Sequence, residues 1–151
     1  MRFYSVLKSR KGKPIDFEKI EKEVEPLCKE YKILLFYIYG SYATGNPWKL
    51  SDIDLAYLPE NELTYEEEFK FRERLEEIFE DEGIDLVNLK KVPLTLIHRI
   101  LKEGKCLYGK DIKTRIDFEI RKEMEYFETE WMRKDYFEKM IKRIENGSIW
   151  N

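Results

Sequence analysis

Residues 33–41 read ILLFYIYGS, and after an interval of ten residues the chain continues at 52–57 as DIDLAY. The first run is almost wholly apolar, as expected for a central strand covered on both faces, and it ends in Gly40-Ser41. The second run opens with two carboxylates two positions apart and then alternates, which predicts a strand with two different faces. These two predicted strands decide both the fold class and the expected functional site.

Three carboxylates on the predicted strands point to metal chemistry. Asp52 and Asp54 should share one face of their strand, because successive side chains of a strand point to opposite faces. Carboxylates together with substrate phosphates are the ligands that Mg²⁺ prefers. Asp85, in a third short apolar run, is predicted to be the third metal ligand and the base for an attacking hydroxyl. We therefore expect two Mg²⁺ ions, about 3.5–4 Å apart as in other two-metal sites.

Gly40 and Ser41 are expected to bind the triphosphate of a nucleotide. Glycine allows the backbone to approach a phosphate closely, and the amides at the start of a short helix donate hydrogen bonds to it. The hydroxyl of Ser41 adds a further donor. Together with the three carboxylates, these are the parts of a small nucleotidyltransferase.

The composition is that of a folded domain without an extended nucleic-acid surface. The chain has 151 residues, of which 42% are hydrophobic and 15% aromatic, enough for one domain with a real core. Its net charge of -3 argues against a broad positive surface, so no direct binding to nucleic acid is expected. No run approaches ~18 apolar residues, and we expect a cytoplasmic protein without a membrane segment.

Histidine and cysteine offer little catalytic chemistry. His98 is the only histidine, which excludes histidine-rich metal sites and argues against a Ser-His-Asp triad, so we expect it to be a helix residue without a catalytic role. Cys28 and Cys106 match no metal or redox spacing and are expected to be reduced and structural. Carboxylates must therefore carry any catalysis.

The remaining patterns predict an α/β or α+β domain with a small mixed sheet flanked by helices. The predicted elements are a helix over 16–31, strands over 32–39, 53–58 and 84–89, a helix opening at a capping box over 64–67, and a helix from Pro93 to Glu103. The capping-box helix should end at Gly83. It is expected to carry an apolar face made of Phe69, Leu75, Ile78 and Phe79.

The last part of the chain predicts a long helical tail. Residues 111–145 contain neither Pro nor Gly and would span ~50 Å as one helix, against a radius of gyration of ~15 Å for such a domain. The tail must therefore bend, split into two helices, or reach a partner. Its main apolar stripe is Ile112, Ile116, Ile120, Met124, Phe127 and Trp131. Aromatic residues off this stripe favour a partner surface, and they are Phe118, Tyr126, Tyr136 and Trp150.

These patterns divide the chain into two parts. Residues 1–110 form the predicted nucleotidyltransferase domain, with an N-terminal helix over about 15–31 and a core over 32–110. Residues 111–151 form a helical segment that packs on this domain or on a partner.

The spacing Gly40-Ser41-x10-Asp52-x-Asp54 resembles the signature of the DNA polymerase β-like nucleotidyltransferase superfamily. The short length is similar to that of the minimal nucleotidyltransferases, the MntA-like antitoxins of HEPN–MNT toxin–antitoxin systems. The resemblance covers about residues 31–110 and implies the nucleotidyltransferase fold. It also implies an enzyme that uses Mg²⁺ and ATP to transfer AMP to a tyrosine of a cognate HEPN toxin, an RNase, within a complex of the two proteins.

The resemblance also implies roles for individual residues. Asp52 and Asp54 would be metal ligands, Asp85 the third carboxylate and base, and Gly40 and Ser41 the nucleotide-binding residues.

The chain departs from the pattern of this family at one position. Many relatives have a basic residue where this chain has Thr44. The contact with the triphosphate would then be missing or come from Lys49, Lys90 or Lys91.

Two alternatives stay open from the sequence. The same chemistry could act on a small-molecule acceptor, as in aminoglycoside adenylyltransferases, although those enzymes usually add a larger second domain. A catalytically idle antitoxin could instead neutralise its toxin by binding alone, although a pure binder has no need to crowd like charges together.

Overall fold

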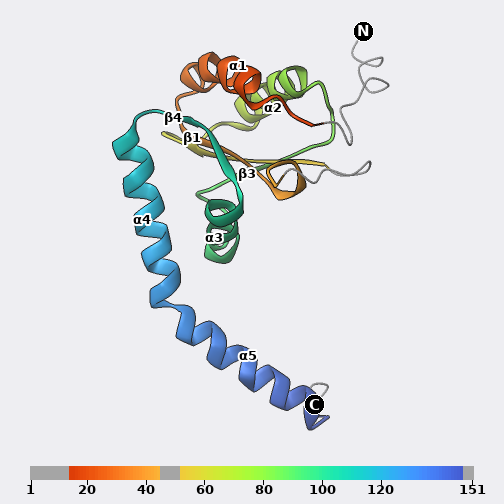
Figure 1. Ribbon diagram of the computed structural model, residues 1–151, viewed down its shortest axis with the longest axis vertical. Helices are drawn as coiled ribbons and strands as arrows, with labels where there is room; N and C mark the ends of the chain where they lie inside the picture. Colours follow the sequence, from red (N-terminus) through yellow and green to blue (C-terminus); the bar gives the residue numbers. More distant parts are fainter. Residues whose placement is uncertain (1–13, 45–51, 148–151) are drawn as a thin grey trace.

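The computed structural model describes residues 14–44 and 52–147, which form a four-stranded sheet with helices on both faces (Figure 1). The predicted fold class is confirmed. In chain order the elements are α1 (Phe17–Glu30), β1 (Ile33–Tyr39), the short 3₁₀ helix η3 (Gly40–Tyr42), β2 (Ile53–Pro59), α2 (Tyr65–Phe79), β3 (Ile84–Asn88), α3 (Leu94–Glu103), β4 (Lys105–Gly109), α4 (Ile112–Glu128) and α5 (Glu130–Glu145).

The sheet is mixed, with the strand order β3-β2-β1-β4. β2 runs parallel to β3, and α2 forms the crossover between them, while β1 pairs antiparallel with both β2 and β4. The sequence did not predict β4. Its five residues include one buried side chain, Leu107, so it lacks the apolar run that marks the other strands.

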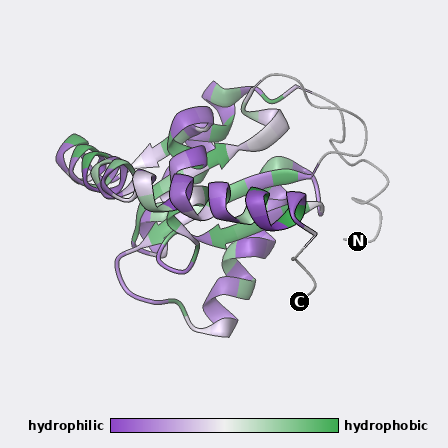
Figure 2. Cartoon of the chain, turned by 90° about the horizontal axis from the view of Figure 1, so that it is seen from below, coloured by the Kyte–Doolittle hydropathy of each residue, from purple (hydrophilic) through white to green (hydrophobic). Residues whose placement is uncertain are grey.

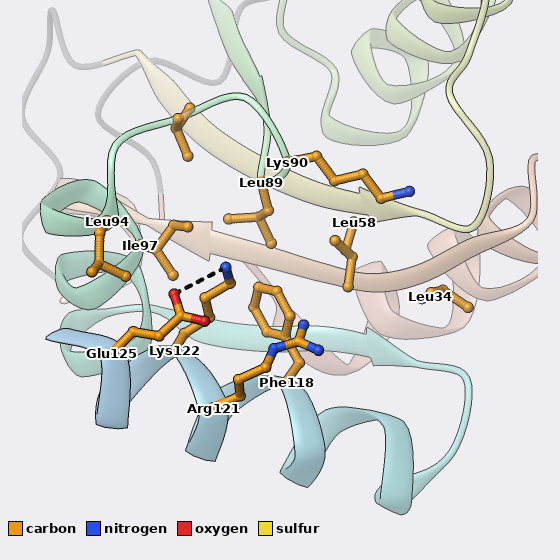
Figure 3. Close-up of a pocket in the computed structure, with 11 residues that line it drawn as sticks. Leu34, Leu58, Leu89, Lys90, Leu94, Ile97, Phe118, Arg121, Lys122 and Glu125 are labelled. Atoms are coloured by element: carbon orange, nitrogen blue, oxygen red, sulfur yellow. Dashed lines mark hydrogen bonds and ion pairs between the residues drawn. The ribbon is translucent and has the colours of Figure 1, made fainter. Parts of the chain in front are cut away.

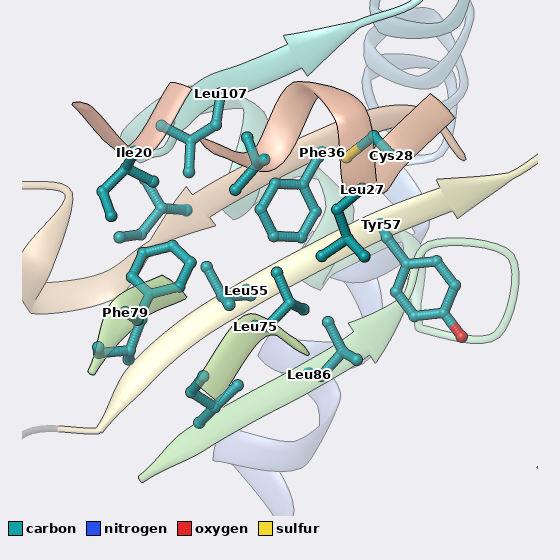
Figure 4. Packing of buried hydrophobic residues seen from close by; sticks show 14 of the residues in the cluster. Ile20, Leu27, Cys28, Phe36, Leu55, Tyr57, Leu75, Phe79, Leu86 and Leu107 are labelled. Carbon is teal, nitrogen blue, oxygen red and sulfur yellow. The ribbon is translucent and has the colours of Figure 1, made fainter. Parts of the chain in front are cut away.

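Two hydrophobic cores lie on the two faces of this sheet. One core lies between the sheet and helices α1 and α2, where Phe36 and Leu55 pack against Leu27 and Leu75 (Figure 4). The other lies between the sheet, α3 and α4. Six of the seven residues of β1 are buried, which confirms that it is the central strand covered on both faces. In Figure 2 the green, hydrophobic residues concentrate in the sheet, whereas the helices are largely purple.

Local capping explains where α2 begins, and a backbone turn explains where it ends. Thr64 and Glu67 form the predicted capping box, each side chain accepting a hydrogen bond from the backbone of the other. The helix ends at Phe79 and not near Gly83, because Glu80 adopts a left-handed conformation with φ 54°. The carboxylate of buried Asp81 then accepts a hydrogen bond from the amide of Gly83 at 2.7 Å.

One predicted member of the apolar face of α2 is wrong. Phe69 is 62% exposed, and Phe71 takes its place in the core. The ring of Phe71 makes edge contacts with Phe36 and Tyr57, at centroid distances of 6.2 and 5.5 Å. Residues two positions apart lie about 200° apart around a helix, so the rotation of α2 about its axis decides whether Phe69 or Phe71 faces the sheet.

The tail splits into two helices at Thr129, one of the outcomes that its length allowed. α4 packs on α3 and on the sheet, whereas α5 has no buried residue and extends away from the sheet (Figure 1). The expected partner surface is wrong for Phe118, which is buried in the core of this face. Trp150 lies outside the described residues.

A stack of side chains joins α3, α4 and α5 at the junction of the tail helices. The ring of Tyr126 lies flat on the imidazole of His98, with centroids 3.7 Å apart and planes 6° apart. The guanidinium of Arg133 covers the other side of the tyrosine at 3.8 Å from its centroid. The Nδ1 of His98 lies 3.0 Å from the carboxylate of Glu123. This stack gives His98 a packing role and fixes the direction in which α5 leaves the domain.

Both cysteines are free, as predicted. Cys28 is buried in the core, and burial raises the pKa of its thiol well above the ordinary value. Within residues 14–44 and 52–147, no helix is long and apolar enough to cross a membrane.

We predict that Phe118 anchors the tail to the domain. Phe118→Ala should lower the free energy of unfolding by about 3–4 kcal/mol, because it leaves a cavity between α4 and the sheet. The matched control is Phe127→Ala on the same helix, which truncates a ring that is 58% exposed and should cost below about 1 kcal/mol. Urea unfolding of both variants measures the difference, and equal costs would contradict the anchoring role.

Candidate active site

The ends of three strands bring the predicted site residues to one edge of the sheet. Tyr39, the last residue of β1, pairs with Asp54, and Asp54 pairs with Asp85 on β3. Tyr39, Asp54 and Asp85 thus form a row across the three strands. They lie side by side because β2 and β3 start at the same edge of the sheet and antiparallel β1 ends there. Gly40 follows Tyr39 directly at this edge. The structure therefore brings Gly40, Asp54 and Asp85 together, with Asp52 two residues before Asp54.

The strand alternation turns the carboxylates toward the α3 face of the sheet. Ile53 and Leu55 lie in the core under α1 and α2, whereas Ala56 lies in the core under α3. Asp54 has the same parity as Ala56 and therefore shares its face. The prediction that Ile53 and Leu55 point into the core is confirmed. The shared face of Asp52 and Asp54 stays a prediction, because Asp52 lies before the start of β2.

Asp54 is the electrostatic centre of the group. Burial, followed by the charges of Asp85 and Asp52, raises the pKa of its half-buried carboxyl to about 6. The positive charge of Arg99 acts in the opposite direction. Asp52 and Asp85 themselves are exposed at the edge of the sheet. Asp52 and Asp85 thus raise the pKa of Asp54 through their negative charges, and Arg99 is the one cause of this shift that acts against them.

The donor chemistry of this group suits Mg²⁺, because carboxylate oxygens are the hard ligands that Mg²⁺ binds. Among the described residues, no three His, Cys, Asp or Glu side chains are grouped closely enough to hold a metal ion. The residues therefore fit the ion by charge and donor type, without forming a closed cage. The role of all three carboxylates as ligands stays a prediction.

Gly40 is required at its position for two reasons. Its φ is +74°, a conformation that side chains other than glycine rarely adopt. A Cβ at this position would also lie 2.2 Å from Oδ2 of Asp54, so the carboxylate occupies the space that a side chain would need. The absence of a side chain at Gly40 thus allows the turn η3 to pack directly against the carboxylate of Asp54.

Ser41 and Thr44 belong to the same turn. The hydroxyl of Thr44 donates a hydrogen bond to the backbone carbonyl of Ser41 at 3.2 Å, and the amides of Ala43 and Thr44 both donate to the carbonyl of Gly40. Thr44 therefore closes the turn in place of the basic side chain expected there. The predicted role of Ser41 as a phosphate contact stays a prediction.

Two residues near the carboxylates were missed by the sequence analysis. Burial, followed by the charges of Asp54 and Asp85, raises the pKa of the Tyr39 hydroxyl to about 12. The charge of Arg99, on α3, lowers the pKa of both Tyr39 and Asp54. The alternation of β1 could have placed Tyr39 on the carboxylate face, but only the packing of α3 over the sheet brings Arg99 near it.

The expectation that Lys90 or Lys91 contacts the triphosphate is wrong for this structure. Both follow the end of β3, about 16 Å of strand from Asp85 at its start. There Lys90 donates to the backbone carbonyl of Glu60 at 3.3 Å, and Lys91 pairs with Glu62 at 3.3 Å. Lys49 lies outside the described residues.

A pocket of about 480 Å³ lies on the α3 face, at the end of the strands opposite to the carboxylates (Figure 3). Leu58, Leu89 and Phe118 line its apolar part. Lys122 and Glu125, 3.4 Å apart, lie at its α4 side (Figure 3). Leu58 is four residues beyond Asp54 on β2, about 13 Å along the strand, so this pocket is separate from the carboxylate site.

We predict that Asp54 destabilises the fold at neutral pH. Its pKa in the folded protein, about 6, is above the ordinary value of 3.8, so the fold favours the neutral form. The stability that the neutral form provides is present below pH 4 and is lost as the pH rises through 6. Asp54→Asn, which is always neutral, should therefore raise the unfolding temperature at pH 7.5 by about 2–4 °C, and this gain should vanish near pH 4.

Thermal unfolding between pH 4 and 8, without divalent cations, measures this effect. Asp117→Asn, at an exposed position on α4, is the control and should change the unfolding temperature little at any pH. A loss of stability in Asp54→Asn at pH 7.5 would contradict the expected charge repulsion.

Comparison with known proteins identifies the family of this fold. Residues 5–113 match the family described as "Polymerase beta, Nucleotidyltransferase". The protein adenylyltransferase MntA of Shewanella oneidensis is 32% identical over 78 residues, which are 52% of this chain and 55% of MntA. The match thus spans about half the length of that relative.

Solved structures share the fold. The crystal structure of a toxin–antitoxin with AMP-PNP aligns with a TM-score of 0.66 at 24% identity, covering 80% of this chain and 98% of that chain. A structure of the tri-AMPylated Shewanella oneidensis HEPN toxin in complex with MNT antitoxin aligns with a TM-score of 0.65 at 21% identity, covering 83% and 98%. With its family match, its sheet topology and the row of residues at the edge of its sheet, the chain belongs to the polymerase β nucleotidyltransferase family.

Proposed function

We propose that this chain is a Mg²⁺-dependent nucleotidyltransferase antitoxin. It transfers AMP from ATP to a tyrosine of a cognate HEPN-domain RNase toxin and so neutralises it. The observation that carries the proposal is the contact of Gly40 with Asp54 in the same row as Asp85, in a chain of this family. Further support comes from MntA, which is named a protein adenylyltransferase, and from solved relatives described as toxin–antitoxin complexes.

The proposed roles follow from the positions of the side chains. Asp54 on β2 and Asp52, directly before this strand, bind Mg²⁺, and Asp85 adds the third carboxylate from β3. Gly40 and Ser41 hold the β- and γ-phosphates of ATP at the turn after β1. When bound, Mg²⁺ supplies the positive charge that stabilises the reacting phosphate oxygens.

The bond changes in the proposed transfer are those of an in-line displacement. The tyrosine hydroxyl oxygen of the toxin forms a bond to the α-phosphorus of ATP, and the bond from this phosphorus to the bridging oxygen of pyrophosphate breaks. Asp85 accepts the proton of the hydroxyl, and the pyrophosphate leaves from the Gly40-Ser41 turn. The reaction needs ATP and Mg²⁺ and is proposed to take place in the cytoplasm.

The first test measures whether a HEPN-domain protein encoded beside this chain gains AMP. Intact-mass spectrometry of the co-purified pair, after incubation with Mg²⁺ and ATP, should show one or more added AMP masses on the neighbour. The double variant Asp52→Asn/Asp54→Asn should abolish the gain, whereas the control Asp117→Asn should leave it unchanged.

The other outcomes separate the alternatives. A stable complex without any mass change, in which the double variant still neutralises the toxin, would support inhibition by binding alone. Activity on small molecules, with none on the neighbour, would support the alternative of a small-molecule acceptor.

We further predict that Gly40→Ala removes activity more than it removes stability. The new methyl group must displace the carboxylate of Asp54, which lies 2.2 Å from its position, and a misplacement of this size should lower the transfer rate by about 100-fold or more. Gly147→Ala is the matched control, because Gly147 has a φ of +68° but nothing within 4 Å of a Cβ. Both variants carry backbone strain of about 1–2 kcal/mol, so similar losses of activity would contradict the role of Gly40.

A further inference from the structure

The C-terminal end of α3 packs against the strand that carries Tyr39 into the row of carboxylates. A Cβ at Gly104, the residue after α3, would lie 2.9 Å from the carbonyl oxygen of Ile38 and 3.3 Å from the Cβ of Tyr39. Tyr39 in turn pairs with Asp54. α3 lies on the face of the sheet opposite to α1 and α2 (Figure 1), and the strand alternation turns the side chain of Asp54 to the α3 face. The last turns of this helix therefore end beside the carboxylate site.

Arg99 is a cation on the outer side of these last turns. Its side chain is 57% exposed, and its Nε lies 3.4 Å from Oε2 of Glu103, one turn further along the helix. His98, which precedes it, faces α4 through its stack with Tyr126. Consecutive residues of a helix lie about 100° apart around its axis, so Arg99 does not share the α4 side with His98. The long side chain of Arg99 is therefore free of the contacts that attach α3 to the tail.

The guanidinium of Arg99 acts on the carboxylate site without pairing with it. Its positive charge lowers the pKa of both Tyr39 and Asp54. Within residues 14–44 and 52–147, however, no ion pair joins Arg99 to Asp54 or Asp85, and its carboxylate partner is Glu103. This arrangement suits a phosphate between the two, because phosphate oxygens accept hydrogen bonds from a guanidinium and also bind Mg²⁺ that is held by carboxylates.

Other basic side chains near this edge of the sheet are directed elsewhere. Arg72 donates from α2, on the opposite face, to the backbone carbonyl of Ile84 at 2.8 Å. The ammonium of Lys105 lies 4.2 Å from the ring centroid of Phe17 at the start of α1. Lys102 lines a groove together with residues of α4. Among these side chains of the described residues, the arginine on the outer side of α3 is thus the one that acts on the carboxylates.

We propose that Arg99 is a catalytic residue that binds the α-phosphate of ATP, an inference that rests on the proposed nucleotidyltransferase function. Thr44 closes the turn where a basic side chain was expected, so the triphosphate needs positive charge from elsewhere in the fold. Gly40 and Ser41 hold the β- and γ-phosphates, which leaves the α-phosphate at the carboxylates and within the field of Arg99. Its N–H groups stabilise the charge on the non-bridging oxygens while the bond to the acceptor oxygen forms and the bond to pyrophosphate breaks. Arg99 keeps its proton throughout, because a guanidinium is not deprotonated in proteins.

Binding of α,β-methylene-ATP to the purified full chain tests this contact without any acceptor protein. In isothermal titration calorimetry with Mg²⁺, Arg99→Gln should weaken binding by about 10-fold or more, because a charge-assisted hydrogen bond is lost. Arg99→Lys keeps the charge and should restore part of the affinity. Unchanged binding by Arg99→Gln would overturn this inference alone. A wild-type chain that binds no nucleotide would overturn the proposed function together with it.

Two control variants on the same helix separate this contact from a structural role. Glu103→Gln removes the ion pair of Arg99 but keeps its charge, and Lys102→Gln removes a positive charge on the side of α3 that faces α4. Both should bind the analogue within about twofold of the wild type, because exposed ion pairs of a helix contribute little. If Glu103→Gln weakens binding as much as Arg99→Gln does, Arg99 acts only through its helix pair and the inference is wrong.

AMP transfer to the acceptor protein tests which phosphate Arg99 contacts. With ATP, Arg99→Gln should lower the transfer rate by about 100-fold, more than it weakens binding, because the contact strengthens as charge develops on the α-phosphate. The two α-phosphorothioate isomers of ATP each replace one non-bridging oxygen of this phosphate by sulfur, a weaker hydrogen-bond acceptor. The ratio of the transfer rates of the two isomers should therefore differ between the wild type and Arg99→Gln. An unchanged ratio would place Arg99 away from the α-phosphate and overturn the proposal.

Discussion

The pairing of β1 with β2 is the constraint on which the rest of the structure depends. β1 is buried on both faces, and its antiparallel register with β2 sets Tyr39 opposite Asp54. The parallel register of β2 and β3 then sets Asp54 beside Asp85. A slip of one residue in either pairing would turn the carboxylates into the core under α1 and α2. The same apolar residues that stabilise the sheet therefore also fix the geometry of the proposed active site.

The proposed active site works against the stability of the fold that holds it. Burial and the like charges at the edge of the sheet raise the pKa of Asp54. Gly40, held in a left-handed conformation, loses more conformational entropy on folding than another residue would. Neither feature helps the domain to fold. Such local costs are typical of sites that are built to bind a cation or a charged substrate, because the ligand supplies the missing interaction when it binds.

Features that depend on strand alternation and helix capping were predicted from the sequence. Features that depend on the rotation of a helix or on contacts between distant segments were not. The strands with apolar runs, the capping box at Thr64 and the inward side chains of Ile53 and Leu55 all follow from local pattern. Strand β4 has one buried residue and depends on its pairing with β1. The exchange of Phe69 for Phe71 depends on how α2 rotates over the sheet. These last features carry no local signal.

Packing also explains why the tail was only partly predicted. Its apolar stripe was visible in the sequence, but a stripe indicates that a face is buried and not what buries it. The structure uses a different residue, Phe118, to attach α4 to the domain, and it leaves the stripe exposed. One helix face thus provides intramolecular stability while the other remains available for association. Because the two faces of α4 are separate, the exposed stripe can take part in association without disturbing the contact of Phe118 with the core.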